Sequence, residues 1–264
     1  MVCWVAERAL AANHVARVIV ATDDPRVRDA VSSAGYEAVM TRSDHKSGTD
    51  RLAEVAPALA EVEILVNVQG DEPLISPETI DRAIVALLED DKCSVATTWE
   101  PITSAADVLN PDLVKVVLDD RGSALYFSRA PVPYPRDAVR RHGSIEAALE
   151  KEPSLLTRFR KHTGLYAYRR EFLLEFARWP QSRLEQAEAL EQLRAIEHGV
   201  KIRVVQASVP SIGVDTIEDL ERVRALVEKG SFEFRVPSFD FDGVSTAPAS
   251  NSKLGTRNSK LVSL

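Results

Sequence analysis

The stretch Val66-Asn67-Val68-Gln69-Gly70-Asp71-Glu72-Pro73 decides the fold of this chain. Its apolar start, together with Ile64 and Leu65, predicts a buried parallel strand, and its polar end predicts a loop. In an open α/β sheet, ligands bind beyond the carboxyl ends of the strands. Asp71 supplies a hard carboxylate oxygen suited to Mg²⁺ at that point. The alternative is that Asp71 only caps a turn.

A second polar cluster, Gly213-Val214-Asp215-Thr216, lies far downstream. Asp215 could bring a second carboxylate to the same cation, because Mg²⁺ takes one or two carboxylates together with substrate phosphates. The two acidic strand ends predict metal-assisted phosphoryl or nucleotidyl chemistry, with Asp71 and Asp215 as catalytic and metal-binding residues. Asp215 could instead cap the helix that begins at Thr216.

The composition excludes several classes of protein. With 264 residues, 45% of them hydrophobic, the chain is long enough for one large α/β domain. Its formal net charge of -7 argues against a nucleic-acid partner, which requires a basic face. Cys3 and Cys93 form no C-x-x-C pair, so we expect neither zinc nor a structural disulfide. Because no apolar run approaches the ~20 residues that span a bilayer, and the first residues do not read as a signal peptide, we expect a cytoplasmic protein without a membrane partner.

Predicted strands and helices alternate over the first third of the chain. The strands cover residues 18–21, 37–40 and 64–68, and the helices cover 2–10, 25–34, 49–59 and 77–88. This alternation predicts a three-layer, Rossmann-like α/β fold whose right-handed, mostly parallel sheet is covered on both sides.

The middle and the end of the chain differ from this pattern. The turn Asp119-Asp120-Arg121-Gly122 predicts an antiparallel hairpin, and the aperiodic stretch 131–160 predicts a mobile excursion. We then expect strands at 162–168 and 202–206, helices at 171–176 and 184–197, and a last helix from Thr216 with Asp219 completing its cap. We expect the folded domain to cover residues 1–230. Residues 231–264 read as a disordered tail, or as a segment whose phenylalanines dock on a surface groove.

Further side chains are candidates for binding an anionic, sugar-like ligand. Gln69 offers a donor and an acceptor for a hydroxyl or a base, and the loop Thr41–Thr49 offers backbone N–H groups before a helix. Arg129, Lys161 and His162 could contact an anion. Glu185, Glu188 and Gln192 share one face of the predicted helix at 184–197. In each case the alternative is structural: a capped loop, a hydrogen-bonded histidine or a solvated helix face.

Taken together, the ordered motifs resemble the CMP-Kdo synthetases, the 3-deoxy-manno-octulosonate (Kdo) cytidylyltransferases. The resemblance covers residues 1–228, and it is specific because the motifs occur in order. They are Val20-Ala21-Thr22-Asp23-Asp24, Thr41-Arg42-Ser43-Asp44-His45-Lys46-Ser47-Gly48-Thr49-Asp50-Arg51, the opening stretch, Tyr126-Phe127-Ser128-Arg129, His162-Thr163-Gly164-Leu165-Tyr166, Leu184-Glu185 through Leu190-Glu191-Gln192-Leu193, and Gly213-Val214-Asp215-Thr216.

The resemblance implies a nucleotide-diphospho-sugar transferase fold and a homodimer whose contacts come from a smaller antiparallel central region. It implies that the anomeric hydroxyl of Kdo attacks the α-phosphate of CTP and expels pyrophosphate, for lipopolysaccharide biosynthesis. Asp71 and Asp215 would hold Mg²⁺. By the same resemblance, Arg42, Ser47 and Gly48 would line the cytidine site, and the sugar acid would be surrounded by Gln69, Arg129, His162, Tyr166, Glu188 and Gln192.

The chain departs from the family pattern at both ends. The family begins with a strand and a basic, glycine-containing loop, whereas this chain begins inside the segment that follows that loop. We therefore expect an N-terminally truncated domain with unpaired sheet edges and weakened grip on the triphosphate. The family offers no counterpart to the tail after Gly230.

These departures leave other functions open. One is a non-catalytic remnant that keeps dimerisation or sugar-acid binding. Another is a cytidylyltransferase for a different acidic sugar, such as sialic acid or an amino-Kdo.

Overall fold

The structure is a computed structural model that describes residues 1–214 and 216–228. Asp215 and the predicted tail, residues 231–264, lie outside the described residues. Among the helices it describes, none combines the length and the apolar character needed to cross a bilayer.

The described chain alternates helices and strands, as the first third of the sequence predicts. In chain order the elements are α1 (Val2–Leu10), β1 (Ile19–Thr22), α2 (Pro25–Ser33), β2 (Glu37–Met40), α3 (Gly48–Val55), η1 (Ala56–Ala58), β3 (Ile64–Asn67), α4 (Pro77–Leu88), β4 (Val95–Pro101), α5 (Ala105–Leu109), β5 (Lys115–Leu118), β6 (Ala124–Ser128), α6 (Arg136–His142), α7 (Ile145–Lys151), η2 (Pro153–Arg158), β7 (Arg160–Arg169), α8 (Arg170–Phe176), α9 (Arg183–Glu188), α10 (Gln192–Glu197), β8 (Ile202–Gln206) and α11 (Ile217–Glu228).

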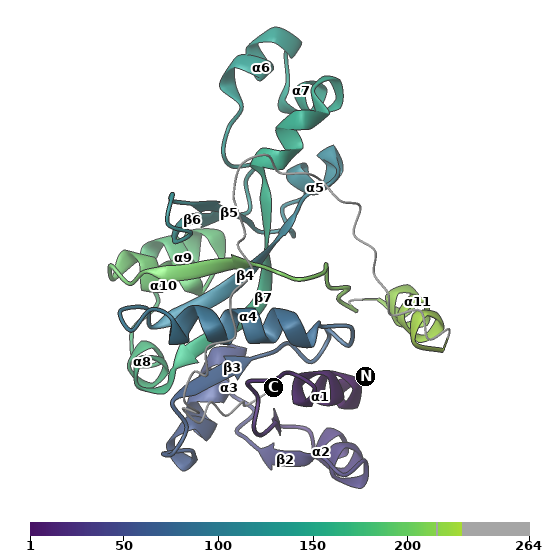
Figure 1. Ribbon diagram of the computed structural model, residues 1–264, viewed down its shortest axis with the longest axis vertical. Helices are drawn as coiled ribbons and strands as arrows, with labels where there is room; N and C mark the ends of the chain where they lie inside the picture. Colours follow the sequence, from purple (N-terminus) through teal and green to yellow (C-terminus); the bar gives the residue numbers. More distant parts are fainter. Residues whose placement is uncertain (215, 229–264) are drawn as a thin grey trace, which may run out of the picture.

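The main sheet is mixed and mostly antiparallel, so the prediction of a mostly parallel sheet is wrong. Its order is β6-β5-β7-β4-β8, with β3 also paired to β7 (Figure 1). The ten-residue strand β7 runs against β3, β4 and β5, and only the β4–β8 pair within this sheet is parallel. The hairpin at residues 119–122 makes β6 antiparallel to β5. The segment between β6 and β7 then brings the chain back to the end of the sheet at which β6 begins. Strand β7 therefore runs in the same direction as β6 and opposite to β3, β4 and β5. The antiparallel β5–β6 hairpin is confirmed.

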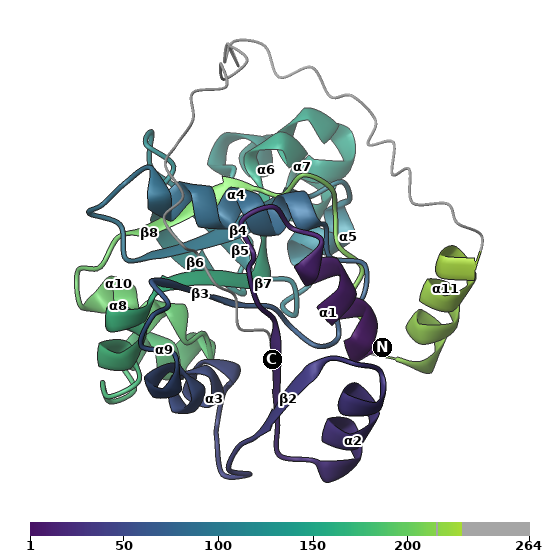
Figure 2. The same ribbon diagram turned by 60° about the horizontal axis from the view of Figure 1, so that its bottom comes forward.

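Strands β1 and β2 form a separate, parallel two-stranded sheet (Figure 2). Val20 of β1 and Val66 of β3 nevertheless share one hydrophobic core, and Ile19 and Leu65 share the core on the opposite face. In the part of the chain that the structure describes, no backbone ladder joins β1 to β3. The backbone hydrogen bonding of the sheet is therefore interrupted between β1 and β3, while the hydrophobic cores on its two faces continue across the interruption.

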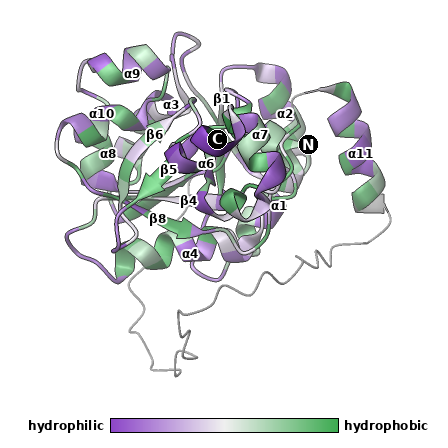
Figure 3. Ribbon diagram, turned by 90° about the horizontal axis from the view of Figure 1, so that it is seen from above, coloured by the Kyte–Doolittle hydropathy of each residue, from purple (hydrophilic) through white to green (hydrophobic). Residues whose placement is uncertain are grey.

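Two layers of helices cover the sheet, one on each side. One core joins α1 and α4 to the strands through Val5, Ile80 and Ile84, and the other joins α3, α8 and α10 through Leu52, among others. Figure 3 shows strands β5 and β8 coloured largely hydrophobic, whereas the covering helices mix both colours. The three-layer arrangement is confirmed, because helices pack on both faces of the mixed sheet.

The stretch 131–160 is ordered rather than a mobile excursion. It forms α6, α7 and η2, which pack with α5 around Phe159, Leu149 and Val108 at the end of the molecule opposite β2 (Figure 1). The sequence pattern did not reveal these helices, because α6 and α7 are only seven residues long and too short to show a helical period.

Two further differences affect the site. The predicted helix at 184–197 is broken into α9 and α10 by Ala189, whose φ of 51° is left-handed. The sequence analysis also missed β4, which lies beside β7 and β8 in the sheet. By contrast, the predicted cap of the last helix is confirmed: Asp219 N donates to Thr216 Oγ1 and Thr216 N donates to Asp219 Oδ2, both at 3.1 Å.

Candidate active site

Asp71 lies on an exposed turn just beyond β3, as the sequence predicts. The segment 207–214, which follows β8 and which we call the strap, reaches this turn: Val214 N donates to Asp71 O at 2.9 Å. The strap is fixed along its length by hydrogen bonds from Ala207 N to Trp99 O (2.9 Å), Ser208 N to Thr79 Oγ1 (2.9 Å) and Ser211 N to Glu100 Oε1 (2.7 Å). The residue before Asp215 is therefore held against Asp71.

Carboxylates are crowded behind this turn. The pKa of Glu72 is raised to about 7, chiefly by burial and also by the neighbouring Glu100 and Asp71 charges, against the opposing effects of a hydrogen bond from Ser211 and of the Lys161 charge. Glu100 is 3% exposed and pairs with Lys161 directly across the β4–β7 ladder, at 3.2 Å from Nζ to Oε2. Lys161 is therefore the cation near both Glu72 and Glu100, and the negative charge of these carboxylates favours binding of a further cation near Asp71.

The donor set fits a magnesium ion bound mainly by substrate and water. Asp71 offers an exposed carboxylate, and the chain enters Asp215 from a point hydrogen-bonded to Asp71. Within residues 1–214 and 216–228, no three acidic, histidine or cysteine side chains are grouped as a metal cage. Mg²⁺ needs no such cage, because it keeps several waters and takes one or two carboxylates with phosphates.

His162, Tyr166 and Gln69 gather around β7. Tyr166 is the ladder partner of Asn67 in β3, and Gln69 Nε2 lies 3.4 Å from Gly164 O. A Cβ on Gly164 would stand 3.0 Å from Gln69 Cγ, so glycine permits this close approach. The rings of His162 and Tyr166 are 5.3 Å apart. The structure thus brings together these three predicted sugar-acid residues.

His162 is neutral and its tautomer is set by Thr97. Thr97 Oγ1 donates to Leu165 O at 2.6 Å, so it accepts from His162 Nε2, which lies 2.9 Å away. Desolvation, and secondarily the Lys161 charge, lower the His162 pKa to about 3. The remaining ring nitrogen, Nδ1, is therefore an acceptor at neutral pH.

Arg129 and Glu188 form a second pair beside this cluster. Ser128 Oγ and Arg129 N donate to the Glu188 carboxylate at 2.7 and 2.9 Å. The Arg129 guanidinium donates to the carbonyl oxygens of Glu188 (2.8 Å) and Pro111 (3.0 Å). Arg129 therefore fixes the α9–α10 turn through neutral carbonyls, and its positive charge stays available to an anion.

Lys115 is a fully buried residue that the sequence analysis missed. Its Nζ donates to Asn110 O (2.8 Å) and Leu113 O (2.5 Å), and burial, followed by repulsion from Arg129, lowers its pKa. A lysine in a strand pattern gives no sign of burial, because its charge usually lies in solvent. Lys115 adds positive potential beneath Arg129.

The three predicted binding residues at the loop Thr41–Thr49, which are Arg42, Ser47 and Gly48, have different surroundings in the structure. Ser47 caps α3, whose first residue is Gly48: Ser47 Oγ accepts from Asp50 N at 3.1 Å and donates to Glu191 Oε1 at 3.0 Å. Arg42 is exposed, pairs with Asp44 at 3.2 Å, and lines a surface cavity of about 510 Å³ that Asp50 of α3 also lines. Of the three predicted residues, Ser47 is the one that a hydrogen bond joins to the α9–α10 region.

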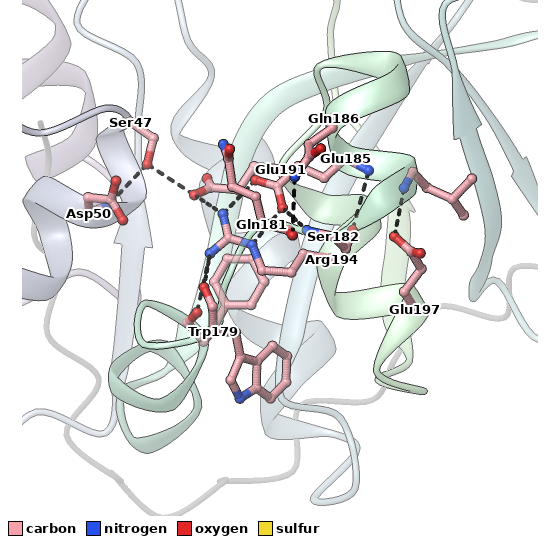
Figure 4. A network of polar contacts seen from close by, with 12 residues as sticks. Ser47, Asp50, Trp179, Gln181, Ser182, Glu185, Gln186, Glu191, Arg194 and Glu197 are labelled. Atoms are coloured by element: carbon pink, nitrogen blue, oxygen red, sulfur yellow. Dashed lines mark hydrogen bonds and ion pairs between the residues drawn. The ribbon is translucent and has the colours of Figure 1, made fainter.

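A buried ion pair fixes that region (Figure 4). Arg194 Nη2 and Nε donate to Glu185 Oε1 and Oε2 at 2.6 and 2.8 Å, and both side chains are nearly inaccessible. The prediction that Glu185, Glu188 and Gln192 share one face of a single helix is wrong, because the break at Ala189 leaves Glu185 and Glu188 on α9 and puts Gln192 on α10. Glu185 turns to Arg194, Glu188 to Ser128 and Arg129, and Gln192 is buried at 8% exposure.

Sequence reasoning found the strand-end residues but missed the side chains that hold them. The missed set is Glu72, Thr97, Glu100, Lys115, Glu191 and Arg194. Their partners come from distant strands, and no local pattern reveals such pairs. The one available signal was the motif Leu190-Glu191-Gln192-Leu193-Arg194, which places two charges inside an apolar helix.

Comparison with known proteins identifies the family. The model of the cytidylyltransferase family matches residues 1–202. A 3-deoxy-manno-octulosonate cytidylyltransferase from Syntrophotalea carbinolica is 49% identical over 85% of this chain and 87% of its own length. The enzyme of the same name from Pelobacter propionicus is 50% identical over 87% and 89%.

Solved structures agree with these relatives. The structure of CMP:2-keto-3-deoxy-manno-octonic acid synthetase complexed with CTP is 45% identical, with a TM-score of 0.76 over 87% of this chain and 88% of its own. A 4-diphosphocytidyl-2C-methyl-D-erythritol synthase from Anaerococcus prevotii, at 14% identity and TM-score 0.53 over 86% and 85%, shares the fold. The chain belongs to the cytidylyltransferase family, among the 3-deoxy-manno-octulosonate cytidylyltransferases.

Proposed function

We propose that this chain transfers CMP from CTP to the anomeric hydroxyl of Kdo, releasing pyrophosphate and forming CMP-Kdo for lipopolysaccharide biosynthesis. The observation that carries the proposal is the strap hydrogen bond from Val214 to Asp71, within a chain about half identical to Kdo cytidylyltransferases. It brings the two acidic segments of the sequence to one place.

In this proposal Asp71 and Asp215 hold Mg²⁺. When bound, the ion neutralises phosphate charge as pyrophosphate leaves. Glu72 and Glu100 lie behind Asp71, and their crowded negative charge favours a cation at the turn. Positioning and charge neutralisation supply most of the catalysis in phosphoryl transfer, so no strong base is required of the protein.

The sugar acid would lie over β7, among Gln69, His162, Tyr166, Arg129, Glu188 and Gln192. His162 Nδ1 would accept a hydrogen bond from a sugar hydroxyl, because the ring is neutral and Nε2 donates to Thr97. The charges of Arg129 and buried Lys115 would attract the carboxylate of the sugar. Ser47 and Gly48 would line the cytidine site at the start of α3, with Arg42 at its outer edge.

We also infer a homodimer formed through the central region. Leu125 of β6 and Tyr134, which precedes α6, expose 57% and 60% of their surface. Both side chains belong to the central region, and contact with a second copy of the chain would cover them.

The test is a product assay with purified full-length chain. CTP, Kdo and Mg²⁺ are expected to give pyrophosphate and CMP-Kdo in equal amounts, identified by mass spectrometry. UTP or ATP in place of CTP should give at most a small fraction of this rate. Faster turnover of sialic acid than of Kdo would assign a different acidic sugar, and Kdo binding without turnover would identify a non-catalytic homologue.

A further inference from the structure

One hydroxyl joins the two proposed substrate regions. Ser47 Oγ accepts from Asp50 N and so caps α3, and the same oxygen donates its proton to Glu191 Oε1 at 3.0 Å. Ser47 and Glu191 lie 144 residues apart in the chain. Figure 4 shows Ser47 between the start of α3 and the α9–α10 helices. Any displacement of Glu191 would therefore act on the helix N-terminus that the nucleotide is proposed to meet.

Glu191 is a partly buried carboxylate with hydrogen bonds from two hydroxyl groups of the α3 start, those of Ser47 and Thr49. Burial raises its pKa, while hydrogen bonds from Thr49 and Ser47 lower it. Arg194 is the neighbouring cation, but its two short hydrogen bonds go to Glu185, and its Nη2 lies 3.4 Å from Glu191. The first turn of α3 thus supplies much of the polar environment that Glu191 needs.

The sugar-acid side is attached to the same short turn. Glu188 precedes Ala189, and Glu191 follows it by two residues. The backbone of Ala189 is left-handed, a conformation that is unfavourable for a non-glycine residue and persists only where surrounding contacts impose it. Those contacts are the Glu185–Arg194 pair, which spans the break, and Arg129, whose Nε donates to Glu188 O. These contacts fix the conformation of the turn, and Glu188 and Glu191 flank it in the sequence.

We propose that Glu191 is a positioning residue that fixes the start of α3 relative to the α9–α10 turn, and so sets the nucleotide site against the sugar-acid site. Glu191 acts through Ser47 and the Asp50 amide. The expected effect on KM rests on the proposed function. The hydrogen bond between Ser47 and Glu191 does not depend on that function.

The test compares Glu191→Gln with the matched control Glu197→Gln. Both glutamates belong to the α10 region, but Glu197 accepts from Leu184 N at 3.0 Å on the side away from Ser47 (Figure 4). Glutamine keeps the size of the side chain and removes its charge. For E191Q we expect roughly tenfold higher KM values for CTP and for Kdo, the loss typical of one charge-assisted hydrogen bond, with kcat changed less than about threefold. For E197Q we expect both KM values to stay within about twofold of wild type.

Hydrogen exchange provides a readout that does not need activity. The Asp50 amide should exchange roughly tenfold faster in E191Q than in E197Q, because the hydrogen bond that anchors its acceptor Ser47 loses its charge assistance. In the cycle Ser47→Ala with Glu191→Gln, the effects on KM should fail to add, since both variants act on the same Ser47–Glu191 contact.

Three results would overturn the inference. They are equal KM values in E191Q and E197Q, a lower melting temperature in E191Q with unchanged KM values, or unchanged Asp50 exchange. If wild type itself makes no CMP-Kdo, the proposed function fails, while the exchange of Asp50 still decides whether Glu191 holds α3.

Discussion

The N–H of Val214 donates to the carbonyl oxygen of Asp71 at 2.9 Å, joining two segments that lie far apart in the domain sequence. Each segment carries one of the two aspartates that the sequence analysis assigned to a cation. The backbone bond is independent of the ionisation of either carboxylate. It therefore assembles this part of the site before any ligand arrives.

Replacement of Asp71 by Asn should reduce kcat for pyrophosphate release by about 10²-fold or more, because a neutral amide would bind a divalent cation more weakly than a carboxylate does. The matched control is Asp29→Asn, which alters an exposed aspartate of α2 paired with Arg28. Initial rates at saturating CTP, Kdo and Mg²⁺ measure both. An Asp71→Asn variant that retained a tenth of the wild-type kcat would contradict the assignment.

Replacement of Glu100 by Gln should loosen the strap. Glu100 accepts from Ser211 N at 2.7 Å and pairs with Lys161, and the variant loses the ion pair. Hydrogen exchange at the Ser211 and Val214 amides should accelerate by roughly tenfold or more, since charge-assisted hydrogen bonds contribute about 1.5–3 kcal/mol. The control is Glu78→Gln on α4, whose partner Arg82 is exposed. Unchanged exchange at both amides would mean that the strap does not depend on Glu100.

His162 should make stability depend on pH in acid. Its pKa is about 3 in the folded state against an ordinary value of 6.5, so between these values the unfolded chain binds more protons. The free energy of unfolding then falls as the pH drops from 6.5 towards 3, by up to about 1.4 kcal/mol per pH unit from this group. Well above pH 6.5 the group contributes no pH dependence.

Urea unfolding of wild type and His162→Gln at about pH 5 and pH 7 measures this contribution. The difference in unfolding free energy between the two proteins should shift in favour of wild type at the higher pH. This subtraction removes groups of opposite sign such as Glu72, whose raised pKa weakens stability as the pH rises from 4.5 to about 7. A difference that is equal at both pH values would show that folding does not lower the pKa of His162.

Replacement of Glu188 by Gln should act on the sugar acid rather than on the nucleotide. The carboxylate accepts from Ser128 Oγ and Arg129 N, and an amide can accept only through its single oxygen. We expect the KM for Kdo to rise by roughly ten- to a hundredfold and the KM for CTP to change less than about threefold. Glu175→Gln on the exposed face of α8 is the control. Equal effects on both KM values would place Glu188 outside the sugar site.

The sequence predicted local structure better than strand direction. The short apolar runs at β1, β2, β3 and β8 were identified because each ends at a turn signal, and the Asp119–Gly122 turn correctly predicted a hairpin. Strand β7 was also recognised, but its direction depends on where residues 129–159 return the chain. The periodicity of the sequence does not encode the direction of β7. The sequence pattern therefore predicts a mostly parallel sheet, whereas the sheet in the structure is mixed.

The same distinction holds for the site. Asp71, Gln69 and His162 were identifiable because each follows or opens a strand in a recognisable motif. Lys115 and Arg194 were not, because a charged residue in an apolar run gains its partners only from tertiary structure. Ala189 shows the limit most clearly: alanine favours a helix, and its left-handed backbone is held by tertiary contacts that include the Glu185–Arg194 pair and Arg129.

The most direct test of the central claim is the affinity for one divalent cation when each proposed ligand is removed. Mn²⁺ binding in the presence of CTP can be titrated by electron paramagnetic resonance in wild type, Asp71→Asn, Asp215→Asn and the double variant. We predict one strong site in wild type, at least roughly tenfold weaker binding in each single variant, and a double variant in which the two effects do not add. Wild-type affinity in Asp215→Asn, or in Asp71→Asn, would show that the two aspartates do not share a cation.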